Sequence, residues 1–273
     1  MRVSRHLVEA RRERLVTMIA QYGYLPVQEL CRRLGISEAT ARRDLSGLEK
    51  EKKVRRTYGG AISEYDSRFP SFSERRDQSK SAKRKIAKAS LSYILPGSTC
   101  FFDAGTTIYA IAEAFREHPI VPLKIVTSNI PIGELLAGIP GVEVFLVAGR
   151  LLSRQSVLLG EIARKSLKFW RFDSAFLSAE AMNPNGIWNS QAAIVEQQQA
   201  VIRRTRLAIF CLDGRKLRRN APHFLLPWNK VDVLLTEVPR RELLQAGIRI
   251  VEARYSSALD KRKAANRQPP AKR

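Results

Sequence analysis

Two short helical patterns joined by a single glycine, in the segment Leu25–Arg56, constrain the fold of this chain more than any other feature. Apolar residues recur at helical spacing up to Gly35, which interrupts the pattern; they are Val27, Leu30, Cys31 and Leu34. Ser37 follows as a natural N-cap, because its side-chain oxygen can accept from the free amides of a helix start. The second helix is expected over Glu38–Glu51. A helix, a glycine-containing turn and a helix with polar and basic residues near its start form the helix-turn-helix layout.

The second of these helices carries the side chains expected to meet DNA. In a helix-turn-helix, this helix enters the major groove with its N-terminal residues against the base edges. Thr40 and Arg43 are therefore expected to contact bases, while Arg42 could pair with phosphate, with Glu38 or with Glu49. Within the helix-turn-helix Leu25 to Asp44, the predicted DNA-contacting residues are Ser37, Glu38, Thr40, Arg42 and Arg43.

A run of cations follows the second helix directly. Four of the five residues Lys52–Arg56 are basic, and Tyr58-Gly59-Gly60-Ala61 comes next. A charge run on a helical hairpin is most often only a solvated surface, but a basic strand pair ending in glycines fits a wing beside the groove. The wing residues predicted to contact phosphate are Lys52, Lys53, Arg55 and Arg56. Together these patterns favour binding to double-stranded DNA.

Composition agrees with a polyanionic partner. The 273-residue chain has a formal net charge of +22 and a sequence pI near 10.5, although charge alone does not separate DNA from RNA or an acidic membrane. Cys31, Cys100 and Cys211 are far apart and have no zinc-ligand spacing, which favours a reducing compartment. No apolar run has the length of a signal peptide or a membrane span. We therefore expect a cytoplasmic protein with no membrane association, no metal and no cofactor.

Changes in pattern along the chain predict two domains. A helix over Leu7–Tyr22, with Leu7, Leu15, Met18 and Ile19 facing inward and Arg11, Arg12 and Arg14 outward, completes a DNA-binding domain over residues 7–62. The serine-rich stretch 63–81 is expected to be a linker, with Phe69 and Phe72 as possible anchors. A second domain is expected over 82–238, and 239–273 forms a basic extension with a disordered end.

The second domain alternates apolar strands with helices. Its first helix, Lys83–Tyr93, stops before Pro96-Gly97, and further helices are expected at Ile108–Phe115 and Pro131–Ala137. The expected strands are Thr99–Phe102, Lys124–Val126, Val142–Val147, Phe172–Leu177, Leu207–Leu212 and Val231–Leu235, with one more possible at Ile248–Val251. Strands that lack polar alternation and are separated by helices predict an α/β fold with a parallel sheet covered on both faces.

Four polar clusters fall at the carboxyl ends of the predicted strands, where open α/β sheets bind ligands. They are Asp103–Thr107, Thr127–Asn129, Ala148–Arg150 and Asp213–Lys216. Gly105-Thr106-Thr107 offers hydroxyls and free backbone amides at a helix start, which suits a phosphate or carboxylate. A strand-to-helix turn favours such residues even without a ligand, but four clusters at one edge favour a small anion, with Arg150 and Lys216 supplying positive charge. No Gly-x-Gly-x-x-Gly or Walker pattern points to a dinucleotide or ATP.

These motifs together resemble the DeoR-type family of bacterial transcriptional regulators. The resemblance rests on Arg42–Leu45, Gly59–Ala61, Lys85-Ile86-Ala87, Asp103–Thr107, Thr127–Asn129, Gly186, Glu196 and Asp213–Lys216, in the family's order. It implies a winged helix-turn-helix joined to a sensor domain of the ribose-phosphate-isomerase-like α/β fold. Such regulators commonly repress sugar-catabolism operons and release DNA when a phosphorylated sugar binds. The effector-site residues that the resemblance implies are Asp103, Gly105, Thr106, Thr107, Asn129 and Lys216.

Other classes of protein stay open at this point. The chain could be a sugar-phosphate isomerase or transferase with an appended DNA-binding domain, in which Asp103, Glu180, Glu196 and Lys216 supply acid–base chemistry. No two of those carboxylates have a recognisable catalytic spacing. An architectural DNA binder would not need an apolar sheet domain of this size. Because one helix-turn-helix reads only a few base pairs, a homo-oligomer, dimer or tetramer, is also expected.

Overall fold

The computed structural model describes residues 5–22, 24–57, 60–63, 70–217, 219, 221–249 and 255–257. The chain forms two compact units. The first is residues 1–70 together with 191–193, and the second is residues 71–190 together with 194–273. Each unit has its own hydrophobic core, so each is described separately.

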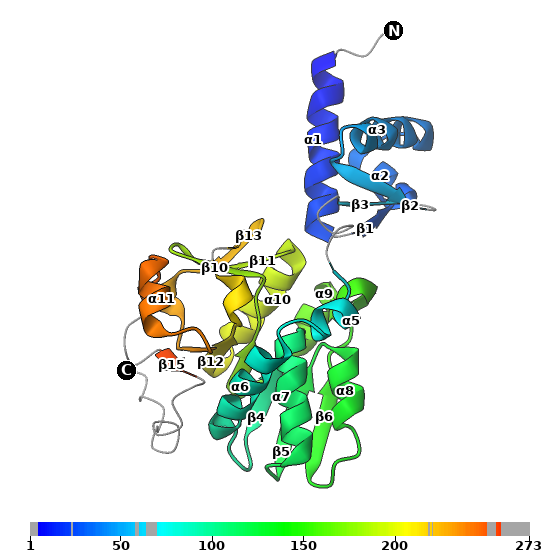
Figure 1. Ribbon diagram of the computed structural model, residues 1–273. Helices are drawn as coiled ribbons and strands as arrows, with labels where there is room; N and C mark the ends of the chain where they lie inside the picture. Colours follow the sequence, from blue (N-terminus) through cyan, green and yellow to red (C-terminus); the bar gives the residue numbers. More distant parts are fainter. Residues whose placement is uncertain are drawn as a thin grey trace. The chain divides into compact units, whose positions relative to one another are not determined.

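The described residues of the first unit form three helices and a small antiparallel sheet (Figure 1). Its strand order is β1-β3-β2, in which β2 and β3 form the predicted wing hairpin and β1 adds a strand that the sequence pattern did not suggest. The elements are α1 (Arg5–Tyr22), β1 (Tyr24–Pro26), α2 (Val27–Leu34), α3 (Glu38–Lys50), β2 (Val54–Thr57) and β3 (Gly60–Ser63). The expected winged helix-turn-helix is confirmed, with Tyr58 and Gly59 of the wing tip lying outside the described residues.

Local chemistry explains the turn between α2 and α3. Gly35 adopts φ 63° and ψ 36°, a left-handed conformation that costs a residue with a Cβ much more than it costs glycine. Ser37 then caps α3, since its hydroxyl accepts from the Thr40 amide at 3.3 Å. Leu30, Leu45 and Leu48 are almost completely buried, so both helices are held against α1 by one small core.

The predicted orientation of α1 is wrong at three positions. Leu7 is 59% exposed, because its end of the helix extends beyond the core. Arg11 and Arg12, expected to face solvent, both bind Asp44 of α3: Arg11 Nε lies 2.6 Å from Oδ2 and Arg12 Nε 3.4 Å from Oδ1. Asp44 is only 2% exposed, and a buried carboxylate needs such partners. This ion-pair cluster therefore joins α1 to the helix predicted to enter the groove.

Gly47 makes room for the Arg12 side chain. A Cβ built at this position would lie 2.3 Å from Arg12 Nη2, so a larger residue would push the guanidinium aside. The same guanidinium also reaches Glu51, with 3.2 Å between Nη1 and Oε1. A glycine in a helix interior costs about 1 kcal/mol relative to alanine. Here it permits a contact between helices that an alanine would obstruct.

The second unit is built on a seven-stranded sheet whose described pairings are all parallel. Its strand order is β15-β14-β12-β9-β4-β5-β6. The strands are β4 (Thr99–Phe102), β5 (Leu123–Thr127), β6 (Val142–Leu146), β9 (Phe172–Leu177), β12 (Thr205–Cys211), β14 (Val233–Thr236) and β15 (Tyr255–Ser257). The predicted α/β fold with a parallel sheet is confirmed, and the six strands expected between residues 99 and 235 all form.

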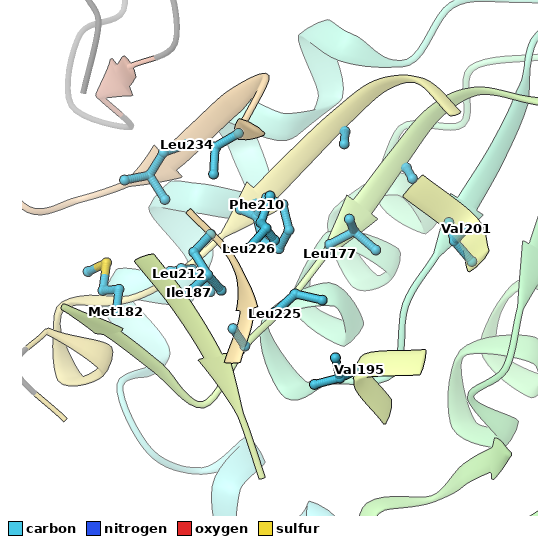
Figure 2. Packing of buried hydrophobic residues seen from close by; sticks show 14 of the residues in the cluster. Leu177, Met182, Ile187, Val195, Val201, Phe210, Leu212, Leu225, Leu226 and Leu234 are labelled. Atoms are coloured by element: carbon cyan, nitrogen blue, oxygen red, sulfur yellow. The ribbon is translucent and has the colours of Figure 1, made fainter. Parts of the chain in front are cut away.

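Both faces of this sheet are covered (Figure 1). One face packs against α6 (Lys80–Ser90), α7 (Thr106–Glu117) and α8 (Ile130–Leu136). The other packs against α9 (Glu161–Leu167), α10 (Ala192–Ile202), α11 (Arg240–Gln245) and a three-stranded sheet of β10 (Ala181–Asn183), β11 (Gly186–Asn189) and β13 (His223–Leu226). Figure 2 shows how Phe210 of the large sheet packs beside Leu226 of the small one. Burial on both faces explains why these strands lack polar alternation.

The remaining elements are short. α5 (Phe72–Arg76) opens with a capping box of Ser71 and Glu74, and its buried Phe72 packs edge-on against Tyr109. A ribbon of β7 (Arg150–Leu152) and β8 (Val157–Leu159) follows β6, and single 3-10 turns occupy Leu91–Tyr93, Ser153–Gln155, Gly214–Lys216 and Trp228–Lys230. Residues 64–69 of the predicted linker and 258–273 of the tail lie outside the described residues.

The strand suggested at Ile248–Val251 does not include its first two residues. Ile248 and Arg249 are not in a strand, and residues 250–254 lie outside the described part. The edge strand is β15 instead, which pairs parallel with β14. Ile248 is apolar because it is buried in the core beside α11, which explains why a short apolar run resembled a strand.

The Asp44 cluster gives a first test. Asp44→Ala should destabilise the first unit by about 1.5–3 kcal/mol, because it removes charge-assisted hydrogen bonds from two partly buried arginines, of which only Arg12 keeps another ion pair, with Glu51. Urea unfolding of the first unit measures this change in the free energy of unfolding. Glu38→Ala is the matched control: it breaks an exposed ion pair with Arg42 on the same helix and should cost less than about 1 kcal/mol. Equal losses for both variants would contradict a structural role for Asp44.

Candidate functional site

The start of α3 presents exposed polar and basic side chains. The Ser37 and Thr40 hydroxyls lie 3.0 Å apart, and Arg42 Nη2 lies 3.2 Å from Glu38 Oε2, so in this structure Arg42 pairs with Glu38 rather than Glu49. Arg43 is exposed and has no ion pair with another residue that the structure describes. Its guanidinium is therefore available for a two-pronged contact with a guanine edge or with phosphate.

The wing adds exposed cations next to this helix. Lys52, Lys53, Arg55 and Arg56 are all exposed, with Lys53 Nζ 2.8 Å from Glu51 Oε2. Glu49 Oε1 accepts from the Arg56 amide at 2.8 Å, which ties β2 to α3. The wing and α3 are therefore joined, and both carry exposed cations. Exposed positive charge attracts a nucleic-acid backbone.

In the second unit, sheet register brings the polar strand ends together. Phe102 at the end of β4 pairs with Thr127 of β5 and with Phe176 of β9. The residues that follow these strands therefore share one edge, as is usual for ligand sites in open α/β sheets. The sequence predicted this meeting for Asp103 and Asn129, but it gave no role to Ser178.

Asp103 is a buried carboxylate held by neutral donors. It is 3% exposed, and its Oδ2 accepts from the Ser178 amide at 3.1 Å and from Gln198 Nε2 at 2.7 Å. Gln198 is oriented in turn by Asn189, whose Nδ2 donates to its Oε1 at 3.0 Å. Among the residues that the structure describes, no lysine, arginine or histidine nitrogen lies within 4.0 Å of this carboxylate. Burial raises the pKa of Asp103 to about 6, although the hydrogen bonds from Ser178, Gln198 and Ala104 oppose that shift.

The turn after Asp103 leads into the N-terminus of α7. Gly105 has an extended conformation, and a Cβ there would lie 2.2 Å from Ser178 Oγ, so the glycine is needed for close packing against the end of β9. Thr106 and Thr107 form the first turn of α7 and are 7% and 4% exposed. The first amides of a helix have no partner within that helix, so this end of α7 favours an anion.

The Asn129 side chain forms two structural hydrogen bonds. Its Oδ1 caps α8 by accepting from the Ile132 amide at 3.1 Å, and its Nδ2 donates to the Ser156 carbonyl at 2.9 Å. Arg150 is exposed at the start of β7. Glu196 forms an ion pair with Arg164 and does not contact Asp103. Among the described residues, neither the Asn129 side chain nor Glu196 forms a hydrogen bond with the Asp103–Gly105 turn.

A cluster of cations surrounds Glu180. Lys216 Nζ lies 2.9 Å from its Oε2, and Arg219 Nη1 lies 2.7 Å from its Oε1. Arg75 is a third neighbour: burial lowers the pKa of its guanidinium, and the charge of Glu180 opposes that shift. Glu180 is therefore paired with two cations and lies near a third, so positive charge exceeds negative charge in this cluster. Of these residues, only Lys216 was predicted as an effector contact, and Glu180 was considered only as a candidate acid–base residue.

Lys83 continues the cluster from α6. It is 5% exposed, and its Nζ donates to the backbone oxygens of Arg75 at 2.5 Å and Gln78 at 2.7 Å. Burial lowers the pKa of Lys83 to about 8; Asp213 favours its charged form, while the cations Lys216, Arg75 and Arg215 oppose it. The burial of Lys83 could have been predicted from the sequence. Lys83 lies three and four positions before the apolar Ile86 and Ala87, which places it on the buried face of the helix.

A pocket of about 280 Å³ lies where α5 and α6 meet the start of α7. Its lining includes four cations, two carboxylates and Thr106: Arg76, Asp77, Lys80, Lys83, Arg84, Thr106, Ala110 and Glu113. Since Lys83 also borders the Glu180 cluster, positive charge extends along this side of the α7 N-terminus.

Comparisons with known proteins agree with both halves of this description. Residues 11–66 match the DeoR-like helix-turn-helix domain, and residues 78–238 match the DeoR C terminal sensor domain. The chain belongs to the DeoR family. It is thus a DNA-binding transcriptional regulator, as the resemblance predicted.

Similar proteins include several named repressors. The chain is 28% identical over 250 residues to the putative aga operon transcriptional repressor of Escherichia coli O157:H7, covering 88% of this chain and 92% of that protein. It is 28% identical to the glycerol-3-phosphate regulon repressor of Escherichia coli K12, covering 84% and 90% of the two chains. It is 27% identical to the repressor GlcR of Bacillus subtilis, covering 82% and 88%.

Among solved structures, ribose 5-phosphate isomerase A from Neisseria gonorrhoeae matches with 17% identity and a TM-score of 0.34, over 49% of this chain and 52% of the enzyme. Likeness at this level does not bear on activity. In the part of the chain that the structure describes, no helix has the length and apolar character needed to cross a bilayer.

The buried carboxylate gives a pH-dependent test. Because Asp103 has a higher pKa in the folded protein than the ordinary 3.8, its charge destabilises the fold above about pH 6, and this loss disappears as pH falls toward 4. Asp103→Asn should therefore stabilise the ligand-free protein at pH 8 by up to about 3 kcal/mol, with the gain shrinking at pH 5. Thermal and urea unfolding at the two pH values measure this. Glu117→Gln, at an exposed carboxylate of α7, should change little at either pH. A variant less stable than wild type at pH 8 would contradict the argument.

Proposed function

We propose that the protein represses an operon of carbohydrate catabolism, and that a phosphorylated sugar relieves this repression. The aga operon, glycerol-3-phosphate regulon and GlcR proteins are all named as repressors, and they match this chain over most of their length. We also propose that residues 7–62 form the DNA-binding domain, 63–81 the linker, 82–238 the effector-sensing domain and 239–273 a basic extension. The protein would act in the cytoplasm, where operator DNA is accessible.

Operator DNA would be bound through α3 and the wing. Thr40 and Arg43 would meet base edges from the start of α3, supported by Ser37, Glu38 and Arg42, while Lys52, Lys53, Arg55 and Arg56 would meet phosphates. Specific recognition by one short helix is limited, so two copies of the chain, or four, would bind repeated half-sites.

The proposed effector site rests on the cluster of cations at the carboxyl ends of the sheet strands. Arg75, Lys83, Lys216 and Arg219 gather there against Glu180 and Asp213, and the free amides of α7 lie at the same edge of the sheet. A surplus of buried and half-buried cations is unfavourable without a compensating anion. A phosphate group supplies two negative charges and several acceptor oxygens. Gly105, Thr106 and Thr107 would bind the phosphate together with Lys216, while Asp103 would contact the sugar. Asn129 and Arg150 are the remaining residues of the proposed effector site.

The enzyme alternative lacks a free acid–base pair. Both oxygens of Glu180 are engaged by cations, Glu196 is paired with Arg164, and Asp103 contacts only neutral donors among the described residues. We therefore propose sensing without turnover. The test is to incubate the purified protein with ribose 5-phosphate and hexose 6-phosphates and to follow their isomers by chromatography. Conversion that depends on the protein would favour the enzyme alternative.

Arg43 tests the DNA interface. With an operator obtained by in vitro selection from random duplexes, Arg43→Ala should weaken specific binding by about 1–3 kcal/mol, as expected for loss of a bidentate base contact. Gel shift at fixed salt measures it. Lys50→Ala removes one positive charge from the other end of the same helix and should have a much smaller effect. If both variants bind the operator like wild type, α3 is not the recognition helix.

Lys216 tests the effector site. Phosphorylated sugars that raise the melting temperature are identified first, since a ligand at 100 times its Kd adds about 2.7 kcal/mol to the stability of the native state. Lys216→Ala should then bind operator normally but lose most of the ligand response, whose coupling is typically about 1–3 kcal/mol. Lys230→Ala, at an exposed lysine of the same unit, is the control. A ligand that binds wild type without changing its operator affinity would refute the sensor mechanism.

A further inference from the structure

Asp103 is an anion without a counter-charge in the described structure. Its neighbours Ser178, Gln198 and Ala104 offer only amide donors, while Lys216 and Arg219 pair with Glu180 instead. The same edge of the sheet thus holds one site with surplus positive charge and another with an uncompensated carboxylate. A buried carboxylate in neutral surroundings lowers the stability of the ligand-free protein. A ligand that brings a cation to it would remove that cost.

The strand end beside Asp103 also contains a polar atom without a partner. Ser128 Oγ is buried and has no hydrogen-bond partner among the described residues. Phe101 pairs with Val126 and Phe102 with Thr127, so Asp103 and Ser128 follow at adjacent positions on the same side of the sheet. A serine hydroxyl can both donate and accept, so Ser128 can pair with a ligand group at this strand end.

We infer that the effector is an amino-sugar phosphate, whose protonated amine binds Asp103 while its phosphate binds the α7 N-terminus and the Lys216 cluster. The inference rests on the proposed function and specifies its ligand. An ammonium group has three donors and one positive charge, which matches a carboxylate and the neighbouring Ser128 hydroxyl oxygen. A sugar hydroxyl at the same place would donate one hydrogen bond and leave the carboxylate charge uncompensated. Asp103 is thereby a specificity-determining residue for the amine.

Matched pairs of ligands test this inference. Glucosamine 6-phosphate and galactosamine 6-phosphate differ from glucose 6-phosphate and galactose 6-phosphate by an amine in place of one hydroxyl. Titration calorimetry at pH 7 with the full chain should show at least one amine binding about 10- to 100-fold more tightly than its hydroxyl partner, the range expected for a hydrogen bond to a charged group. N-acetylation, which removes the charge, should abolish the preference.

Two variants locate the effect. Asp103→Asn keeps the shape of the side chain and should bring the two affinities within about twofold by weakening only the amine. Lys216→Ala should weaken both ligands equally, because both carry the phosphate. Glu117→Gln, on the exposed face of α7, should retain the wild-type preference.

Each outcome has a distinct meaning. Tighter amine binding that disappears in Asp103→Asn supports the inference. Equal binding of amine and hydroxyl ligands by wild type overturns it and leaves the proposed sugar-phosphate sensor intact. An amine preference that survives in Asp103→Asn also overturns it, since the amine would then bind elsewhere. If none of these phosphates nor ribose 5-phosphate binds, the proposed function fails together with the inference.

Discussion

Parallel pairing of β4 with β5 on one side and β9 on the other is the constraint on which the sensor domain depends. It places the residues after three central strands at a single edge, although they come from distant parts of the sequence. Burial of Phe101, Phe102 and Phe176 on the two faces supplies the hydrophobic free energy that holds the strands in this register. Polar residues at that edge can then be unfavourable individually, because the core beneath them compensates.

The functional chemistry of the chain lies where charge is not balanced locally. Among the described residues, Asp103 has no cationic partner, Glu180 is paired with two cations and lies near a third, and Lys83 is a buried ammonium held by two carbonyl oxygens. In the DNA-binding unit the opposite holds at Asp44, whose two arginines satisfy it and fix α3 on α1. The contrast separates a structural carboxylate, fully paired in the free protein, from carboxylates and cations left for a ligand.

Sequence reasoning succeeded where the signal is local. Gly35 and Ser37 act through their own backbone and side-chain geometry, so the turn and the start of α3 could be predicted from them. It failed at Arg11 and Arg12, since a helix pattern distinguishes apolar from polar positions but does not show that a buried Asp44 will recruit arginines. It also missed Arg75 and Gln198, whose importance arises from partners more than 90 residues away in the sequence.

The sequence by itself determined the winged helix-turn-helix, the alternation of strands and helices, and the family, because propensity, capping and hydrophobic period are properties of neighbouring residues. Tertiary structure alone decided which polar groups are buried, which carboxylate lies among several cations and which has no cationic partner among the described residues. It also showed that Asn129, which was predicted to contact the effector, caps α8 with its side-chain oxygen. These outcomes depend on strand order and register, and on the loss of water at a particular edge of the sheet, which no short segment of the chain encodes.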